Sequence, residues 1–393
     1  MQAGSKPAYF FSQPHQPFFF AGIVWAVAVM LLFGLSYKGI LFLQVSPLLF
    51  HAYTLLFTVF TPFFTGFIFT TFPRFCQSGV IAKTDYLGIF ALLQFGSVLT
   101  VAGALLSLPL MAAGSLVLLV SHLRIVSQLQ RIYQTGYAST ASSDPFWILT
   151  GFYFGALSHL LFAVEITTAA FGTDAGLLAP AAAVGIWLYL IFVAFAVGQR
   201  MVPFFSHVMT QKRRYFTATV FGLLVLKSIL ELVGFSWPEL FVDTVLGLYM
   251  LTEFRQWKLP FRHSPAILQV LHLALFWLPA ALLVGALLKT AAVLFGFSAA
   301  KVTLHMAAIG FVVTILIGFG TRVTLGHSGQ TPHADRFAVA LFALVQLLVS
   351  VRALYALFSG AFWLFDLSFT LWLLLFVLWG GRYGPVLVSG KKL

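Results

Sequence analysis

Long runs of apolar residues follow one another along the whole chain, and only short polar stretches separate them. A helix of about 20 apolar residues crosses roughly 30 Å of hydrocarbon, and each run reaches about that length. The pattern predicts twelve membrane-spanning helices, and the short connections make consecutive helices antiparallel neighbours. The predicted spans cover approximately residues 17–37, 47–72, 85–107, 109–131, 146–170, 180–202, 215–235, 238–257, 264–288, 298–320, 335–357 and 361–381.

The predicted fold is therefore all-α, a polytopic membrane helical bundle. We expect residues 1–393 to form a single integral-membrane domain, because no soluble domain can be separated from the spans. The longest polar insert, residues 138–144, predicts a small surface loop. Beyond the pairing of successive helices, the sequence suggests no internal repeat.

Composition supports this prediction and narrows the chemistry. The chain is 61% hydrophobic and only 8% charged, whereas soluble domains average about 25% charged residues. A net charge of +12 does not indicate nucleic acid, since membrane proteins collect Lys and Arg in cytoplasmic loops. The one cysteine, Cys76, excludes an intrachain disulfide and a four-cysteine iron–sulfur site. It also excludes covalent haem attachment through a Cys-x-x-Cys-His motif.

The distribution of Lys and Arg predicts the orientation in the membrane. Seventeen basic residues lie at the termini and in the loops after even-numbered spans, among them Lys6, Lys212, Arg213 and Arg382. Only three lie on the opposite side, and these are Lys38, Lys289 and Lys301. The side richer in Lys and Arg faces the cytoplasm, so both termini are expected there.

Several charged residues fall inside the predicted spans. Arg352 and Asp366 lie at matching depth on adjacent spans and are expected to form an ion pair. Lys227 and Glu231 stand four residues apart on one helix and are expected to pair. Glu165 and Asp243 have no evident partner, so each either carries protons to a buried site or is hydrated near the outer interface.

The stretch from Thr303 to Gln330 combines an apolar helix with His305 near its start and Arg322 and His327 near its end. Imidazole is costly in hydrocarbon and is a common ligand of haem iron and copper. His51 and His305 fall within roughly 6–11 Å of the outer boundary, at 1.5 Å per helical residue. They could bind opposite faces of one haem b, with His305 as an axial ligand.

A second, inner group comprises His207, His272 and His327, which would serve another haem or a copper ion. Arg200 and Arg322 lie near this group, and guanidinium groups suit haem propionates because they bind carboxylates in a bidentate fork. The alternative is a bundle in which histidines only form hydrogen bonds between helices. We favour that interpretation for His159, and we expect His122, His263 and His333 to be solvated surface residues.

Several segments resemble the NnrS family of membrane proteins. They are the stretch from Leu304 to Gly329 with TRVTLGHSG near its end, VLHLALFWLP (270–279), GQRMVPFF (198–205), QPFFFAGIVWA (16–26), FHAYTLLF (50–57) followed by GFIFTTFPRF, and RYGPVL (382–387). The resemblance covers almost the whole chain. It implies a bacterial inner-membrane protein with twelve spans, haem and copper, which acts in the response to nitric oxide and nitrosative stress. Where the family commonly has His-Ala-His-Glu, this chain has His51, Ala52, Tyr53 and Thr54.

Three functions follow from the resemblance and the histidines. The first is an oxidoreductase in which haem, with or without copper, binds and reduces nitric oxide, using an unknown electron donor. The second is a non-enzymatic haem protein that binds or senses nitric oxide. The third is a transporter of haem or copper, which broken helices at mid-membrane in two related halves would support. Membrane lipid is the one further partner expected.

Overall fold

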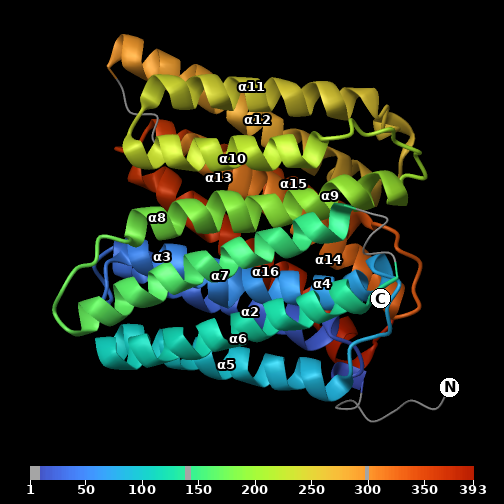
Figure 1. Cartoon of the computed structure of the whole chain (residues 1–393), viewed down its shortest axis with the longest axis horizontal. Coiled ribbons are helices and arrows are strands. Elements are labelled where there is room, and N and C mark those ends of the chain that lie inside the picture. Colours follow the sequence, from blue (N-terminus) through green and yellow to red (C-terminus); the bar gives the residue numbers. More distant parts are fainter. Residues whose placement is uncertain (1–8, 138–142, 297–300) are drawn as a thin grey trace. The chain divides into compact units, whose positions relative to one another are not determined.

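The computed structural model describes residues 9–137, 143–296 and 301–393, and within these ranges it is helical and has no strand. In the described part of the chain, twelve continuous helical segments follow one another (Figure 1). They are α2 (His15–Tyr37), α3 (Pro47–Thr54) with η1 (Leu55–Phe60) and α4 (Thr61–Phe75), α5 (Lys83–Leu106), α6 (Leu108–Thr135), α7 (Ser143–Ala170), α8 (Leu178–Ala183) with η2 (Val184–Ile191) and α9 (Phe192–Phe205), α10 (Phe216–Val233), α11 (Ser236–Gln256), α12 (Ala266–Phe295), α13 (Val302–His305) with η4 (Met306–Val313) and α14 (Thr314–His327), α15 (Arg336–Leu357) and α16 (Phe362–Ser389). A short 3-10 turn, η3 (Phe261–His263), precedes α12.

The predicted all-α membrane bundle is confirmed, and each segment overlaps one predicted span. Among the described residues, eleven of the twelve segments are long and apolar enough to cross a membrane. The exception is α11, which carries Glu239, Asp243 and Glu253. Some helices continue beyond the predicted ends, and α16 reaches Ser389 rather than residue 381. The prediction counted only the residues needed to cross the hydrocarbon, whereas helical hydrogen bonds continue into the residues beyond it. Lys6 and most of the predicted loop at 138–144 lie outside the described residues.

Local sequence signals set several helix ends. The Ser46 side chain accepts a hydrogen bond from the Leu49 N–H, which caps α3 just before Pro47. Asp335 caps α15 in the same way, accepting from the Ala338 N–H. α10 ends at Gly234, whose φ of 77° is the left-handed conformation that glycine adopts without steric cost.

Three segments are buried far more than the rest, and each contains π-helical turns. The buried share of the most apolar 18-residue stretch is 89% in Pro47–Phe75, 83% in Leu178–Phe205 and 83% in Val302–His327. In the other candidate spans this share is 33–61%. These are the second, sixth and tenth segments, so one occurs in every four. Their interior position explains their continuous apolar character on all faces.

An internal repeat relates the first four segments to the last four. The Trp25 indole donates to the Gln94 side chain at 2.8 Å, and the Trp277 indole donates to the Gln346 side chain at 2.7 Å. Both members of the second pair lie 252 positions after their counterparts (25 to 277, 94 to 346). The same tertiary contact is thus made twice, by residues at one constant offset.

Close contacts at two glycines show the same offset. A Cβ at Gly66 would meet Phe18, and a Cβ at Gly318 would meet Val270, which are again pairs separated by 252 positions (66 to 318, 18 to 270). α5 and α15 also begin and end within a residue of that offset. The expectation that the sequence has no repeat is therefore wrong. Apolar residues have replaced one another between the copies, so few identities besides the Trp, Gln and Gly positions remain visible in the sequence.

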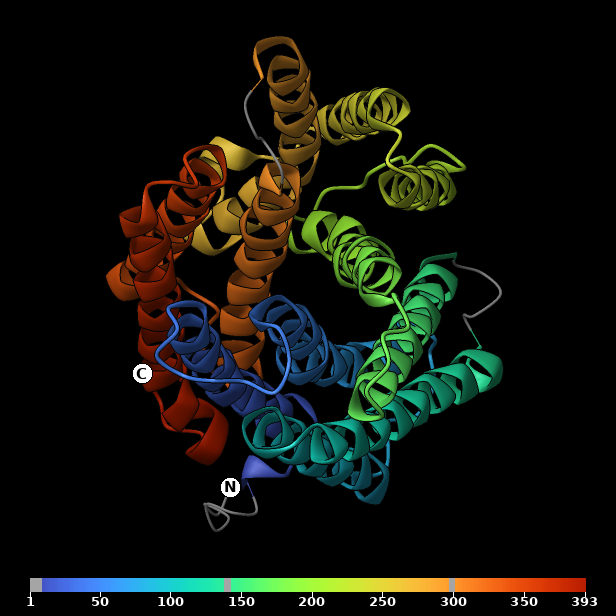
Figure 2. The same ribbon diagram turned by 90° about the vertical axis from the view of Figure 1, so that its left-hand side faces the viewer.

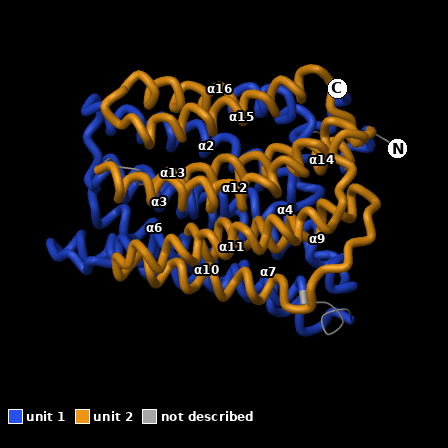
Figure 3. The backbone as a smooth tube through the Cα atoms, turned by 90° about the horizontal axis from the view of Figure 1, so that it is seen from above, with its two compact units in different colours: residues 1–185, 327–330, 376–393 blue, residues 186–326, 331–375 orange. Residues whose placement is uncertain are grey.

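The chain separates into two compact units (Figure 3). Unit 1 comprises residues 1–185, 327–330 and 376–393, and unit 2 comprises residues 186–326 and 331–375. Whether the whole chain forms the single domain predicted from sequence stays a prediction. Within unit 1, α5 and α6 run side by side (Figure 2), and their glycines bring the two backbones together.

Candidate functional site

The most deeply buried imidazoles lie in unit 1, on α6 and α7. His122 and His159 are each 1% exposed, and their ring centres are 5.6 Å apart. Tyr53, from α3, is fully buried and shares a 2.9 Å hydrogen bond with Nε2 of His159. Three side chains that can bind protons or metal ions therefore meet within one apolar environment.

Aromatic rings enclose this group. Phe57 stacks on His159 with ring centres 3.9 Å apart, and Phe162 lies edge-on to Tyr53. The predicted hydrogen bond of His159 between helices is confirmed. The prediction that His122 is a solvated surface residue is wrong, because His122 faces inward from the middle of α6. Its proximity to Arg124 in the sequence was misleading, since residues two apart on a helix point in different directions.

His305 has both ring nitrogens engaged in unit 2. Nδ1 lies 2.8 Å from the backbone oxygen of Lys301, and Nε2 lies 2.9 Å from a guanidinium nitrogen of Arg352. A carbonyl oxygen only accepts and a guanidinium only donates. His305 is therefore a neutral imidazole with the proton on Nδ1 and the lone pair on Nε2. The predicted ion pair between Arg352 and Asp366 stays a prediction.

The predicted inner group is partly assembled. His272 is fully buried on α12, and its Nε2 shares a 2.7 Å hydrogen bond with the Ser206 hydroxyl. The Arg322 guanidinium lies 4.2 Å from the ring centre of Phe205. His207 itself is exposed, with its backbone in the left-handed region at φ 53°. His272 and Arg322 therefore contact the residues just before His207.

The remaining predicted ligands belong to unit 1 or are only half-buried. His51 is half-buried and stacks on Phe33, with ring centres 4.1 Å apart. His327 lies against the buried His15, with ring centres 4.7 Å apart. Arg200 is half-buried in α9, whereas His263 and His333 are exposed, as predicted. Within the described ranges, no group of three or more His, Cys, Asp and Glu side chains is placed to share a metal ion.

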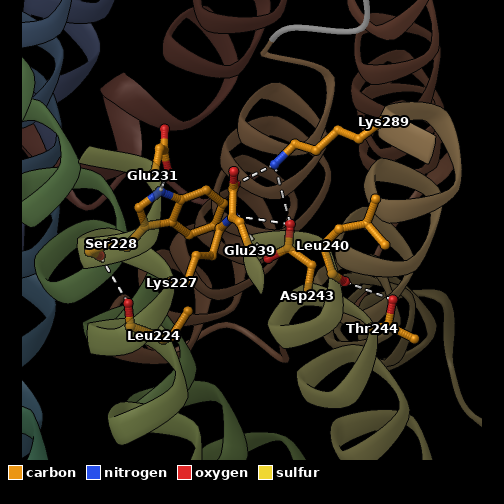
Figure 4. Close-up of polar contacts among 10 residues, drawn as sticks. Leu224, Lys227, Ser228, Glu231, Glu239, Leu240, Asp243, Thr244 and Lys289 are labelled. Atoms are coloured by element: carbon orange, nitrogen blue, oxygen red, sulfur yellow. Dashed lines mark hydrogen bonds and ion pairs between the residues drawn. The ribbon is translucent and has the colours of Figure 1, made fainter. Parts of the chain in front are cut away.

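A buried ion-pair network connects α10, α11 and α12 in unit 2 (Figure 4). Lys227 forms ion pairs with Glu239 and Asp243, both at 2.9 Å. Lys289 also pairs with Glu239, and it lies 3.4 Å from Asp243. The side chains of Lys227 and Asp243 are at most 1% exposed, whereas that of Lys289 is 27% exposed, so the network neutralises a buried pair and reaches the surface at Lys289.

This network corrects the predicted pair on α10. Glu231 does not form an ion pair with Lys227, but accepts a 2.8 Å hydrogen bond from the Trp187 indole. Lys227 points toward α11 and lies 4.5 Å from the Trp187 ring centre. Two carboxylates on the neighbouring helix compensate a buried ammonium better than one exposed glutamate on its own helix. Asp243 therefore has partners that the sequence pattern did not reveal.

Glu165 also has a defined role in unit 1. Its carboxylate accepts a 2.9 Å hydrogen bond from the Leu177 N–H at the beginning of α8. A carboxylate at a helix N-terminus satisfies an otherwise unpaired donor and complements the helix dipole. The side chain thus holds the connection from α7 to α8.

Comparison with known proteins identifies one family. Residues 9–391 match the NnrS protein family, which is nearly the whole chain. No curated protein matches the sequence.

Proposed function

This chain belongs to the NnrS family, and from that premise we propose that it is a haem-binding membrane protein that binds nitric oxide and protects against nitrosative stress. We place it in the bacterial inner membrane with both termini in the cytoplasm, because Lys and Arg concentrate on the side of the termini. Reduction of nitric oxide, with electrons from a donor still to be identified, is the activity to be tested.

The observation that carries the proposal is the state of His305. Imidazoles that bind a metal usually donate the N–H of their other nitrogen to a carboxylate or carbonyl, which fixes the tautomer. Nδ1 of His305 is held in this way by the Lys301 carbonyl, so Nε2 carries the lone pair that an axial ligand requires. The residue fits haem b on condition that Arg352, which donates to Nε2, turns aside.

The chain's own residues would position the group and control access to it. Arg322 and Arg200 remain candidates for pairing with haem propionates, and His51, His272, His207 and His327 remain candidate ligands of a haem or a copper ion. Bound haem would supply an iron that binds nitric oxide. The apolar side chains of the buried spans would favour entry of a small neutral gas over an ion, because a charge is costly to remove from water.

An optical spectrum of the purified protein tests the cofactor. Protein from haem-replete cells should have a Soret band, give the pyridine signal of haem b, and change its spectrum when nitric oxide is added. His305→Ala should lose or shift the band, while the exposed controls His263→Ala and His333→Ala should not. A colourless wild-type protein that is monodisperse and folded would contradict haem binding. An unchanged spectrum in His305→Ala would contradict only the assignment of the ligand.

A turnover measurement separates reduction from binding. With an excess of a chemical reductant, the protein should consume nitric oxide catalytically and release nitrous oxide if the chain is a reductase, because each nitrous oxide formed from two nitric oxide molecules takes up two electrons and two protons. Consumption that stops at one equivalent per haem would instead establish a non-enzymatic binding protein.

A further inference from the structure

Four charged side chains in unit 2 have no part in the proposed haem site. Figure 4 shows them converging from three helices, with Lys227 from α10, Glu239 and Asp243 from α11, and Lys289 from α12. In the expected orientation α11 begins at the outer side, so Asp243 lies about 10 Å inside, at 1.5 Å per residue. Ionisable groups at such a depth are costly and commonly serve the passage of protons or ions.

A structural role alone does not account for these charges. A buried ion pair stabilises a fold little compared with apolar residues of similar volume. Elsewhere in unit 2, α12 packs against η4 through apolar contacts, and a Cβ at Gly310 would lie 2.7 Å from the Trp277 ring. Apolar side chains could join the outer ends of α10, α11 and α12 in the same way. The four charges therefore point to chemistry that apolar residues cannot perform.

Access to water decreases along the network. The exposed fraction of the side chain is 27% for Lys289 and 11% for Glu239, but 1% for Lys227 and zero for Asp243. Lys289 lies six residues before the end of α12 (289 to 295), where a lysine side chain reaches the water at the interface. Glu239 is therefore the carboxylate that water can reach, and Asp243 is the carboxylate held out of water.

Hydrogen-bond distances connect the two carboxylates through an ammonium group. Nζ of Lys227 lies 2.9 Å from Oε1 of Glu239 and 2.9 Å from Oδ1 of Asp243. Lys289 contacts the same oxygen of Glu239 and lies 3.4 Å from Oδ2 of Asp243. An ammonium has three protons and can donate to both carboxylates at once. It can also give one proton to Asp243 while it takes one from a protonated Glu239, so its own charge does not change.

We propose that this network is a proton relay open to the outer side of the membrane, with Glu239 as its entrance and Asp243 as the group that holds the proton. Glu239 binds a proton from water. Lys227 then gives one of its protons to Asp243 and receives the proton of Glu239, which leaves Asp243 neutral and Glu239 ionised again. The net charge of the four groups rises from zero to +1, and Lys289, the group nearest water, bears the excess.

The surrounding charges define the relay and provide a control. The groups that face Asp243 are Lys227 from α10 and Lys289 from α12. Glu231, at the same end of α10, is exposed and instead accepts a 2.8 Å hydrogen bond from the Trp187 indole of η2. Delivery of protons to nitric oxide reduction rests on the proposed function, whereas binding of a proton at Asp243 does not require haem.

Infrared difference spectra of the intact protein test proton binding without turnover. On a step from alkaline to acidic buffer, the wild-type protein should gain the carbonyl band of a protonated carboxyl group, at the frequency of a dry environment. Labelling of aspartate with carbon-13 should shift this band, which distinguishes it from the bands of glutamates and haem propionates. In Asp243→Glu, which keeps a carboxylate, the band should lose its sensitivity to the label. A folded wild-type protein without the band, or a band in Asp243→Glu that still shifts with the label, would overturn the proposal.

The rate of isotope exchange tests the entrance. After transfer to D2O, deuterium should replace the proton on Asp243 about tenfold or more slowly in Glu239→Gln than in the wild type, because the variant removes the group that exchanges protons with water. A purely structural network would loosen in this variant and exchange faster. Glu231→Gln is the matched control and should keep the wild-type rate. Gel filtration and thermal unfolding identify the variants that remain folded.

Equal or faster exchange in a folded Glu239→Gln would contradict the relay, whether or not the protein consumes nitric oxide. A protein that has the aspartate band and the slowed exchange but does not consume nitric oxide would contradict only the use of the relay in that reaction. Failure of the relay and failure of the proposed function are therefore distinguishable.

Discussion

The ammonium of Lys227 lies 2.9 Å from the carboxylate of Asp243, and neither side chain is more than 1% exposed. A buried pair of this kind contributes little against an apolar replacement, but removal of one partner leaves an uncompensated charge out of water. A variant that removes one partner should therefore be less stable than a variant that replaces both partners with apolar residues.

Asp243→Asn should destabilise the protein by about 3–5 kcal/mol, because the variant removes a carboxylate whose two oxygens lie 2.9 and 3.1 Å from the Lys227 ammonium. Thermal unfolding in detergent measures the loss. The double variant Lys227→Met/Asp243→Leu should recover most of the stability, since Lys289 and Glu239 still neutralise each other. Lys391→Met, at an exposed position, is the control. Equal unfolding temperatures for Asp243→Asn and wild type would show that the network does not stabilise the fold.

Two glycines of α5 should respond in opposite ways to alanine. A Cβ at Gly103 would lie 2.1 Å from the Met111 backbone nitrogen, so Gly103→Ala must force α5 and α6 apart. We expect a loss of about 3 kcal/mol or more, at the upper end for overpacked sites. Gly88→Ala meets no atom within 4 Å and should be neutral or stabilise by up to about 1 kcal/mol. Unfolding temperatures of the two variants give the comparison, and similar values would contradict the close approach.

The ion pair expected between Arg352 and Asp366 also predicts a stability loss. Asp366→Asn should cost about 3–5 kcal/mol if the guanidinium is stranded in the bilayer. Because Arg352 donates to Nε2 of His305 and must turn aside before haem binds there, the same variant should also change the affinity of the protein for added haem. Expression and thermal stability equal to wild type would mean that the pair is absent or irrelevant.

The orientation can be measured with reporters fused after Leu393. A reporter enzyme that is active only in the periplasm should be inactive when fused at this position. A reporter protein that fluoresces only in the cytoplasm should fluoresce there. The reverse pattern would place the C-terminus outside.

Periodicity and apolar length were sufficient to predict the helices, because a span must reach a fixed length whatever it packs against. They were not sufficient to predict the direction of individual side chains. His122 near Arg124 looked like a surface residue, and Lys227 near Glu231 looked like a local pair. Both point toward neighbouring helices instead, and the choice of neighbour depends on tertiary packing. The family resemblance was recognisable because its segments occur along nearly the whole chain.

The repeated contacts Trp25–Gln94 and Trp277–Gln346 bear on how the protein arose. Each copy contains four spans, so it begins and ends on the same side of the membrane. The second copy begins at the ninth segment, eight after the first, and this even number keeps the two copies in one orientation, whereas an odd number would have inverted the second copy. The ancestor needed only one topology. At the same offset of 252, the first copy has Tyr53 where the second has His305 (53 to 305), so divergence gave equivalent positions different chemistry.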